Sequence, residues 1–313
     1  MKAYQIGILD FSTLGMTRTA APSTIREIRF LRQAIKALGH IPKVYKVEKC
    51  QLYFDNRQPA ILYNNKPIKG CDILIPRFSI LANIDSEVSI VKQFQMLGIT
   101  VMNKYLPTSR AKNKLRTLQI LTYRGIPVPK TLVVRKLQYL NEGIDLVGGY
   151  PVIIKSPFGS YGTGVAIVES KRSLYSALDI IWKSATNIIL IQEYVAESLG
   201  VDYRAFVIGD KVIASMERTA PQDDFRSNLH QGGEAKVVTL TAEEQRLAIR
   251  ATQALNLDMA GVDILRTKNG PVIMEVNSNP GFEGLMAASG VDVAAELVKY
   301  AVKLHNKTKK TLK

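Results

Sequence analysis

The sequence is poor in the features that mark several classes of protein. Cys50 and Cys71 are its only cysteines in 313 residues, so a disulfide framework is excluded and no Cys/His cluster indicates zinc. No apolar run approaches the ~18 residues of a membrane span, and the first residues turn polar too early for a signal peptide. With 46% hydrophobic and 22% charged residues, the composition is globular rather than disordered or collagenous. We expect a cytoplasmic protein with no membrane partner.

Acidic residues are scarce in the N-terminal half of the chain but not in the C-terminal half. Residues 1–150 carry 23 Lys and Arg against 9 Asp and Glu, a net charge of +14, whereas residues 151–313 carry +1. A basic surface attracts anions such as nucleotides, acidic peptides, membranes or nucleic acids, although the lysines could also serve solubility alone. The basic stretches lack interleaved aromatic residues, so direct nucleic-acid binding is not expected.

The hydrophobic pattern predicts an α/β (α+β) protein. Strands at 6–9, 72–75 and 99–102 alternate with helices at 25–38 and 86–97, which implies a parallel sheet covered by helices. One helix is expected over 108–124. The remaining expected strands are 131–134, 152–155, 165–168, 188–194, 203–207, 212–217, 259–265 and 272–276, and the remaining expected helices are 171–184, 241–255 and 290–305.

Two local signals are specific within this pattern. Gly209-Asp210 separates two strands like a hairpin turn. Thr241 with Glu244 three residues later matches a capping box and predicts the start of a helix.

A glycine-rich loop follows a lysine at the end of a predicted strand. Lys155 precedes Gly159, Gly162 and Gly164, and closely spaced glycines let backbone N–H groups approach an anion. The residue order matches neither a Walker A loop nor the dinucleotide-binding fingerprint, because a strand follows and the Gly-Lys-Ser/Thr order is missing. A phosphate-binding flap and a plain glycine hairpin are both compatible with this segment alone.

Three oxygen-bearing side chains stand among apolar residues near the end of the chain. Glu275 and Asn277 are two residues apart on one predicted strand and share a face, and Asp263 lies on the preceding strand. A loop with an odd number of residues would place Asp263 opposite Glu275, whereas a two-residue turn would place it on the other face. We expect the odd loop, which gives a carboxylate–amide face suited to Mg²⁺ or Mn²⁺ bound together with phosphates.

Two further polar segments have less specific patterns. An apolar strand ends in Gln192-Glu193-Tyr194 and is followed by Asp202 and Arg204, at the strand end where α/β folds usually bind ligands. Arg218 precedes a polar loop over 224–233. Either segment could be an ordinary loop.

Together these features describe a site for a nucleoside triphosphate. In this order they resemble the ATP-grasp carboxylate–amine ligases, and within them the RimK group, which adds glutamate to the C-terminus of a ribosomal protein. The resemblance extends over most of the chain. Its strongest segments are 192–194, 224–230, 260–265, 274–277, 280–281 and 283–284.

The resemblance implies an ATP-grasp fold in three parts. Residues 1–105 would form an N-terminal, Rossmann-like pre-ATP-grasp domain. Residues 106–195 would form the central ATP-grasp subdomain with the glycine flap, and residues 196–313 the C-terminal subdomain with the metal site. A homo-oligomer, either a dimer or a tetramer, is also implied.

The resemblance further implies how the nucleotide is bound. Adenine would lie at Glu193 and Tyr194, and the ribose at Asp202. The remaining implied nucleotide-binding residues contact the phosphates or form the flap over them: Lys114, Lys155, Gly159, Gly162, Gly164, Arg226, Ser227 and Asn228.

Catalytic and metal-binding residues are implied in the same way. Arg226 and Asn228 would face the phosphates and the reacting carboxylate, and Arg204 would be a further contact to phosphate or substrate. The two implied metal ions, Mg²⁺ or Mn²⁺, would be bound by Asp263, Glu275 and Asn277.

The implied activity is ATP-dependent formation of an amide bond through an acyl phosphate. The expected substrates are L-glutamate and an acidic C-terminal tail such as that of a ribosomal protein. The alternative is ligation of an amino acid to a small molecule or coenzyme: a methanopterin, a deazaflavin, a lysine-pathway intermediate or a glutathione-like compound. A kinase-like phosphotransferase fits less well, because its glycine loop would precede the lysine and no HRD or DFG follows. A non-enzymatic RNA binder leaves the carboxylate–amide face unexplained.

Overall fold

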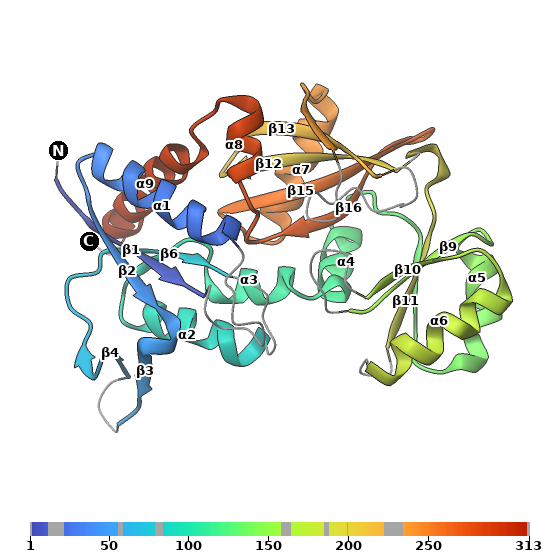
Figure 1. Cartoon of the computed structure of the whole chain (residues 1–313), viewed down its shortest axis with the longest axis horizontal. Coiled ribbons are helices and arrows are strands. Elements are labelled where there is room, and N and C mark those ends of the chain that lie inside the picture. The colour runs from blue at the N-terminus through green and yellow to red at the C-terminus, as the bar shows by residue number, and fades with distance from the viewer. Residues whose placement is uncertain are drawn as a thin grey trace.

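The computed structural model describes residues 2–11, 22–55, 59–78, 84–157, 164–184, 188–198, 200–221 and 234–311. Within them the strands form four sheets: β2-β1-β6-β7, β10-β9-β11-β8, β14-β13-β12-β15-β16 and β3-β4-β5. The first three sheets lie along the molecule, with the five-stranded sheet between the other two (Figure 1).

The first sheet is parallel throughout, as the alternation of strands and helices predicts. Its strands and helices are β1 (Gln5–Asp10), α1 (Pro22–Ala37), β2 (Ile41–Lys46), β6 (Ile73–Arg77), α2 (Ile84–Met96) and β7 (Thr100–Val101). A small antiparallel sheet absent from the prediction is inserted after β2 and the short helix η1 (Val47–Lys49); it consists of β3 (Cys50–Tyr53), β4 (Ala60–Tyr63) and β5 (Lys66–Pro67).

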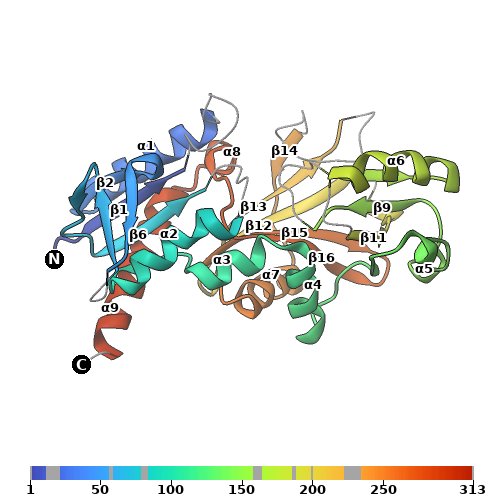
Figure 2. The same cartoon turned by 90° about the horizontal axis from the view of Figure 1, so that it is seen from below.

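The single helix predicted over 108–124 is wrong. The chain forms α3 (Tyr105–Ala111) and α4 (Lys114–Tyr123), which cross the middle of the molecule toward the second sheet (Figure 2). The break comes at Asn113, whose backbone is extended and whose side chain accepts a hydrogen bond from Arg116 N at 3.1 Å. Asparagine is a preferred N-cap, and its cap starts a second helix here.

The second sheet is antiparallel and packs against α5 and α6. Its core includes Leu140 and Ile144 from α5 and Leu174 and Leu178 from α6. The elements are β8 (Thr131–Val134), η2 (Leu137–Tyr139), α5 (Leu140–Leu146), β9 (Val152–Lys155), β10 (Val165–Val168), α6 (Lys171–Ser184) and β11 (Ile189–Glu193).

The five-stranded sheet is antiparallel as well. Two predicted signals in it are confirmed: Gly209-Asp210 forms the β12–β13 turn with Gly209 at φ +61°, and Thr241 and Glu244 form a reciprocal capping box. Its elements are η3 (Ala196–Ser198), β12 (Val201–Ile208), β13 (Lys211–Thr219), β14 (Glu234–Val237), α7 (Ala242–Ala254), β15 (Met259–Thr267) and β16 (Gly270–Asn277).

The two faces of this sheet have different neighbours. On one face, Val262 and Ile264 pack against α7. On the other face, Phe206, Ile208 and Met259 join a core shared with the first sheet. Because side chains alternate along a strand, Asp202, Arg204 and Asp263 lie on this second face, beyond its apolar part. Tertiary packing therefore leaves one polar end of the face for a site.

The chain ends by returning to the first sheet. After α8 (Glu283–Ser289), helix α9 (Val293–Thr311) packs beside α1 and contributes Leu297 and Val298 to the shared core (Figure 1). Among the described residues, no helix combines the length and the apolar character needed to cross a bilayer.

Candidate functional site

Asp263 lies directly opposite Glu275 across strands β15 and β16, and Asn277 lies opposite Gly261. The expected opposition of the two carboxylates is confirmed, but the expected odd loop is wrong. Thr267 pairs with Gly270, which leaves a two-residue loop. A β-bulge at Met274 then shifts the register by one residue and returns Glu275 to the face of Asp263.

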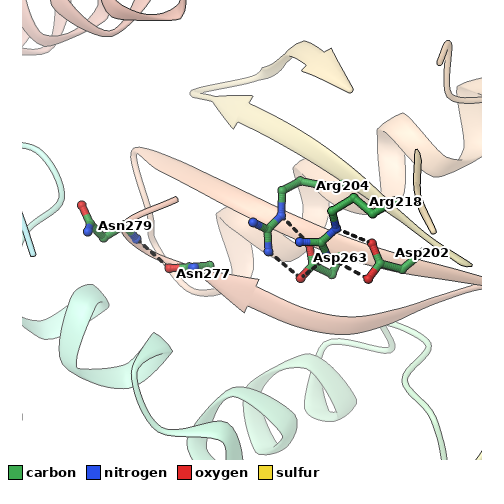
Figure 3. A network of polar contacts seen from close by, with 6 residues as sticks. All are labelled: Asp202, Arg204, Arg218, Asp263, Asn277 and Asn279. Atoms are coloured by element: carbon green, nitrogen blue, oxygen red, sulfur yellow. Dashed lines mark hydrogen bonds and ion pairs between the residues drawn. The ribbon is translucent and has the colours of Figure 1, made fainter. Parts of the chain in front are cut away.

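Asp263 belongs to a network of four charged side chains, with Asp202, Arg204 and Arg218 (Figure 3). Arg204 donates two hydrogen bonds of 2.7 Å to the carboxylate, one to each oxygen. Arg218 lies 3.0 Å from Asp263 Oδ2 and also binds both oxygens of Asp202, at 2.7 and 2.8 Å. The side chains of Asp202, Arg218 and Asp263 are only 2–3% exposed, so these charges are compensated inside the protein.

The pKa values in this network follow from burial and charge. Burial by itself would raise the pKa of Asp263, but Arg204 and Arg218 outweigh it and lower the pKa below the ordinary value of 3.8. Burial opposes the charge of Arg218, yet Asp263 and Asp202 raise its pKa above the ordinary value. Asp263 therefore remains a carboxylate at neutral pH.

Lys114 and Lys155 approach these carboxylates from the central part of the chain. Lys114, the first residue of α4, places Nζ 3.5 Å from Glu275 Oε1, and its backbone N–H donates to Pro157 O. Lys155, at the end of β9, donates to Gln192 Oε1 at 2.6 Å. Burial lowers the pKa of Lys155 to about 8, although Glu275 and Asp263 oppose the shift and Lys114 adds to it. Lys114 therefore pairs with Glu275, and the charges of Glu275 and Asp263 act on Lys155 as well.

A third lysine belongs to this cluster and has no role in the sequence-based assignment. Lys112, in the break between α3 and α4, has its pKa lowered to about 8 by burial, with Glu275 opposing the shift and Lys114 and Arg77 adding to it. Arg218 is likewise without an assigned role, although the sequence shows it before a polar loop. A bulge at Ile213 of β13 shifts the register between Phe206 and Val207 and makes Arg218 the partner of Asp202, and no sequence pattern signals that bulge.

Glu193 and Tyr194 stand at the end of β11. Glu193 Oε1 accepts the backbone N–H of Lys130 at 3.0 Å, and Tyr194 is half-buried. Gln192 is buried and links Lys155 to Thr131. Its Oε1 accepts from Lys155, and its Nε2 donates to Thr131 Oγ1 at 2.8 Å. The structure therefore positions Glu193 by a backbone contact and Lys155 by a side-chain contact.

The glycine loop is described only at its ends. Gly164 has φ +74°, a conformation that favours glycine, and its carbonyl accepts the N–H of Ser156 at 3.0 Å. The other predicted residues of the flap and of the polar loop lie outside the described residues: Gly159, Gly162, Arg226, Ser227 and Asn228.

The oxygen donors fit a hard divalent cation. Glu275 is 43% exposed and Asn277 Oδ1 accepts the N–H of Asn279 at 3.0 Å. Asp263 Oδ1 keeps a second lone pair beyond its contact with Arg204, whereas Asp263 Oδ2 is contacted by both Arg204 and Arg218. No group of three or more His, Cys, Asp and Glu side chains gathers in the described ranges. The set consists instead of two carboxylates and one amide, which suits an ion that also binds phosphate oxygens.

Two domain families match the sequence. The RimK PreATP-grasp domain matches residues 20–106, and the RimK-like ATP-grasp domain matches residues 111–301. A probable alpha-L-glutamate ligase from Nitrosococcus oceani is 40% identical over 275 residues, which are 88% of this chain and 91% of that protein. Another, from Methanococcoides burtonii, is 38% identical over 275 residues, with the same shares of 88% and 91%.

Solved structures with the same architecture have low sequence identity. The ATP-grasp ligase PsnB complexed with a minimal precursor has a TM-score of 0.72 at 18% identity, covering 97% of this chain and 100% of that one. D-alanine–D-alanine ligase from Bacillus anthracis has a TM-score of 0.73 at 18% identity, covering 99% and 100%. These likenesses confirm the predicted ATP-grasp fold. The domain matches and the identity to the glutamate ligases establish that the chain belongs to the RimK-like ATP-grasp family of ligases.

Proposed function

We propose that this ligase uses ATP to join L-glutamate to a carboxylate of an acidic acceptor, such as the C-terminal tail of a ribosomal protein. The observation that carries the proposal is the ion pair of Lys114 with Glu275, which lies directly opposite Asp263. The charges of both carboxylates also act on the pKa of Lys155. The names of the curated relatives support glutamate as the amino acid. The excess of basic residues in positions 1–150 supports an anionic acceptor.

The proposed reaction has two steps. A carboxylate oxygen of the acceptor attacks the γ-phosphorus of ATP, ADP leaves, and an acyl phosphate forms. The amino group of glutamate then attacks the acyl carbon, inorganic phosphate leaves, and the amide remains after loss of a proton. Lys114 and Lys155 bind phosphate oxygens, on which negative charge is spread during transfer. Mg²⁺ or Mn²⁺ held by Asp263, Glu275 and Asn277 would supply further positive charge there.

The proposal also assigns roles to residues around the nucleotide. Glu193 and Tyr194 take the adenine at the end of β11, and Gly164 belongs to a flap that closes over the phosphates. Support for Asp202 at the ribose comes from the family pattern. In the structure its carboxylate is buried and bound by Arg218, so the geometry adds no support for that role. Arg204 acts on a phosphate or substrate from its position on Asp263.

Domain limits and assembly are also part of the proposal. We infer domains over 1–105, 106–195 and 196–313, with α9 packing back onto the first of them. A dimer or a tetramer in the cytoplasm stays our prediction, and sedimentation of the purified chain would test the oligomer.

The first experiment measures ADP and phosphate release from Mg²⁺-ATP with L-glutamate, with and without a peptide ending in acidic residues, while product masses are read in parallel. Release that needs both substrates, with mass added in glutamate steps, supports the proposal. Release with a different amino acid keeps the ligase and changes its substrate. No release with any amino acid and peptide would favour the small-molecule acceptors instead.

Variants test the site itself. Glu275→Ala and Lys155→Ala should abolish turnover, because the first removes a proposed metal ligand and the second removes a positive charge that faces the phosphates. Glu296→Ala, which removes an exposed carboxylate paired with Lys299, is the matched control and should keep full activity. The circular dichroism spectra of the variants should match that of the wild type, and their melting temperatures should differ from it by no more than a few degrees. Full activity of either site variant would refute the assignment.

A further inference from the structure

Arg77 is a buried guanidinium that the proposed reaction does not use. It ends strand β6 and is only 1% exposed. Its Nη2 donates to Glu27 Oε2 at 2.5 Å and to Pro280 O at 3.0 Å. Nε and Nη1 have no hydrogen-bond partner, although both are buried. Buried donors without an acceptor are rare in folded proteins, because they lose their bonds to water without replacement.

Other unpartnered polar atoms lie in the same region. Asn279 Nδ2 donates to the carbonyl of Phe78, the residue after Arg77, while Asn279 Oδ1 is buried without a partner. Ser278 Oγ is also buried without a hydrogen-bond partner. Asp10 is the register partner of Arg77 on β1, yet the described contacts leave Nε and Nη1 of Arg77 without an acceptor. Free donors and a free acceptor therefore meet where β6 ends and the loop after β16 begins.

The position of this cluster connects it to the reaction. Arg77 stands at the carboxyl end of a parallel strand, the edge at which α/β sheets usually bind ligands. Asn279 is two residues from Asn277 and donates its backbone N–H to it. Lys112, which lies 6.0 Å from the Phe78 ring centroid, is close enough to both Arg77 and Glu275 for their charges to act on it. The cluster thus adjoins the proposed metal face on the side of the N-terminal sheet.

The ligand chemistry follows from the free atoms. Guanidinium N–H groups bind carboxylates more strongly than neutral acceptors, and Lys112 adds a second cation. Asn279 Oδ1 can accept an N–H from the same molecule. A carboxylate with a neighbouring N–H is present both in an amino acid and at the end of a peptide. On the basis of the proposed function, we propose that Arg77, with Lys112 and Asn279, binds a carboxylate of one of the two substrates that the ligase joins.

Arg77→Lys tests the subsite with the least disturbance. Lysine can keep the ion pair with Glu27 but lacks the free Nε and Nη1 donors. The KM for one carboxylate substrate, L-glutamate or the acidic peptide, should rise about 10- to 100-fold. The KM for ATP should stay within about twofold. The substrate whose KM rises identifies the source of the carboxylate.

A second pair of variants separates binding from folding. Glu27→Gln/Arg77→Gln replaces the buried ion pair by two amides, so no lone charge is left inside, and it should show the same rise in KM. Glu27→Gln alone keeps the free donors of Arg77 and should keep the wild-type KM values. If neither carboxylate KM changes in the Arg77 variants, or if all three KM values rise together, Arg77 is purely structural and the proposal is wrong.

Melting temperatures keep the test independent of turnover. L-glutamate or the peptide should raise the melting temperature of the wild-type chain, and that rise should vanish in Glu27→Gln/Arg77→Gln. Equal rises in both proteins, or none in either, would overturn the subsite. A third outcome is possible: the wild type shows no glutamate-dependent turnover, but the ligand raises its melting temperature in a way that depends on Arg77. That result would refute the proposed function and keep the subsite.

Discussion

At the level of single residues, the candidate site is built from charges that compensate one another away from water. Asp263 is held by Arg204 and Arg218, and Arg218 is held in turn by Asp202. Removing one member of such a network leaves another charge buried without a partner, which is more damaging than losing the contact itself. Lys155 differs, because its contact is to the neutral Gln192.

The pKa of Lys155 gives a prediction for nucleotide binding. Burial lowers that pKa to about 8, so the free enzyme loses the lysine charge as the pH rises through 8. In the proposed site the ATP phosphates bind the charged form of Lys155, and the KM for ATP should therefore increase by up to about tenfold per pH unit above 8. Steady-state kinetics from pH 7 to 9.5 would show the increase. Lys155→Arg keeps its charge throughout and should give a flat profile; the same increase in that variant would contradict the assignment.

Asp258 gives a prediction for stability. Its Oδ2 is buried without a partner, and burial raises its pKa from 3.8 to about 6, with Lys104 opposing the shift. Because the folded pKa lies above the unfolded one, the folded state binds more protons, and stability falls as the pH rises from about 4 to 6. Asp258→Asn should remove this fall and stabilise the protein at pH 7 by ~1–2 kcal/mol. Urea unfolding at pH 4.5 and pH 7 measures both effects, and a variant that is no more stable at pH 7 would refute them.

At the level of secondary-structure elements, two β-bulges decide which side chains meet. The bulge at Met274 brings Glu275 opposite Asp263, and the bulge at Ile213 brings Arg218 opposite Asp202. Without them, the two-residue turns of both hairpins would pair these residues with the wrong neighbours. The site is therefore a property of hairpin register as much as of residue type.

A substitution in the N-terminal cap of α7 tests whether the stability of this helix is independent of the candidate site. Thr241 Oγ1 accepts the N–H of Glu244 at 3.2 Å, and Glu244 Oε2 accepts the N–H of Thr241 at 2.8 Å. Thr241→Ala should cost about 1 kcal/mol of stability, because it removes one half of the capping box. Chemical denaturation measures the loss. Thr308→Ala, at an exposed position of α9, should cost nothing, and a change in the KM for ATP in Thr241→Ala would contradict the independence of cap and site.

At the level of the whole molecule, the chain leaves its first sheet and returns to it. Asn103 donates to the carbonyls of Met259 and Ser278 and so ties the first sheet to the five-stranded one. Helix α9 then adds Leu297 and Val298 to a core that also contains Ile6 and Phe206. These contacts join the first sheet to the five-stranded sheet that carries Asp263 and Glu275.

The uneven charge of the molecule predicts how it finds an acidic acceptor. Residues 1–150 carry a net charge of +14, and attraction between exposed charges is screened by salt. The KM for an acidic peptide should therefore rise by about tenfold between 50 and 500 mM salt. A peptide with its side-chain carboxylates amidated is the control and should respond much less. A flat response of the acidic peptide would argue against electrostatic recognition.

The sequence by itself determined most of the local elements and the family to which the chain belongs. The alternation of strands and helices, the capping box and the Gly209-Asp210 turn depend on neighbouring residues, and all are found in the structure. The period of two along a strand places Glu275 and Asn277 on one face whatever the rest of the chain does. The family motifs give the fold and the class of reaction for the same reason, since their residues lie within short segments.

The tertiary structure alone decided the partners of these residues. The bulge at Met274, the pairing of Arg218 with Asp202 and the burial of Arg77 against Glu27 join positions that are far apart in the chain. The split of the helix at Asn113 brings Lys112 and Lys114 to the site as well. Register and burial depend on packing summed over many distant side chains, which no local pattern records.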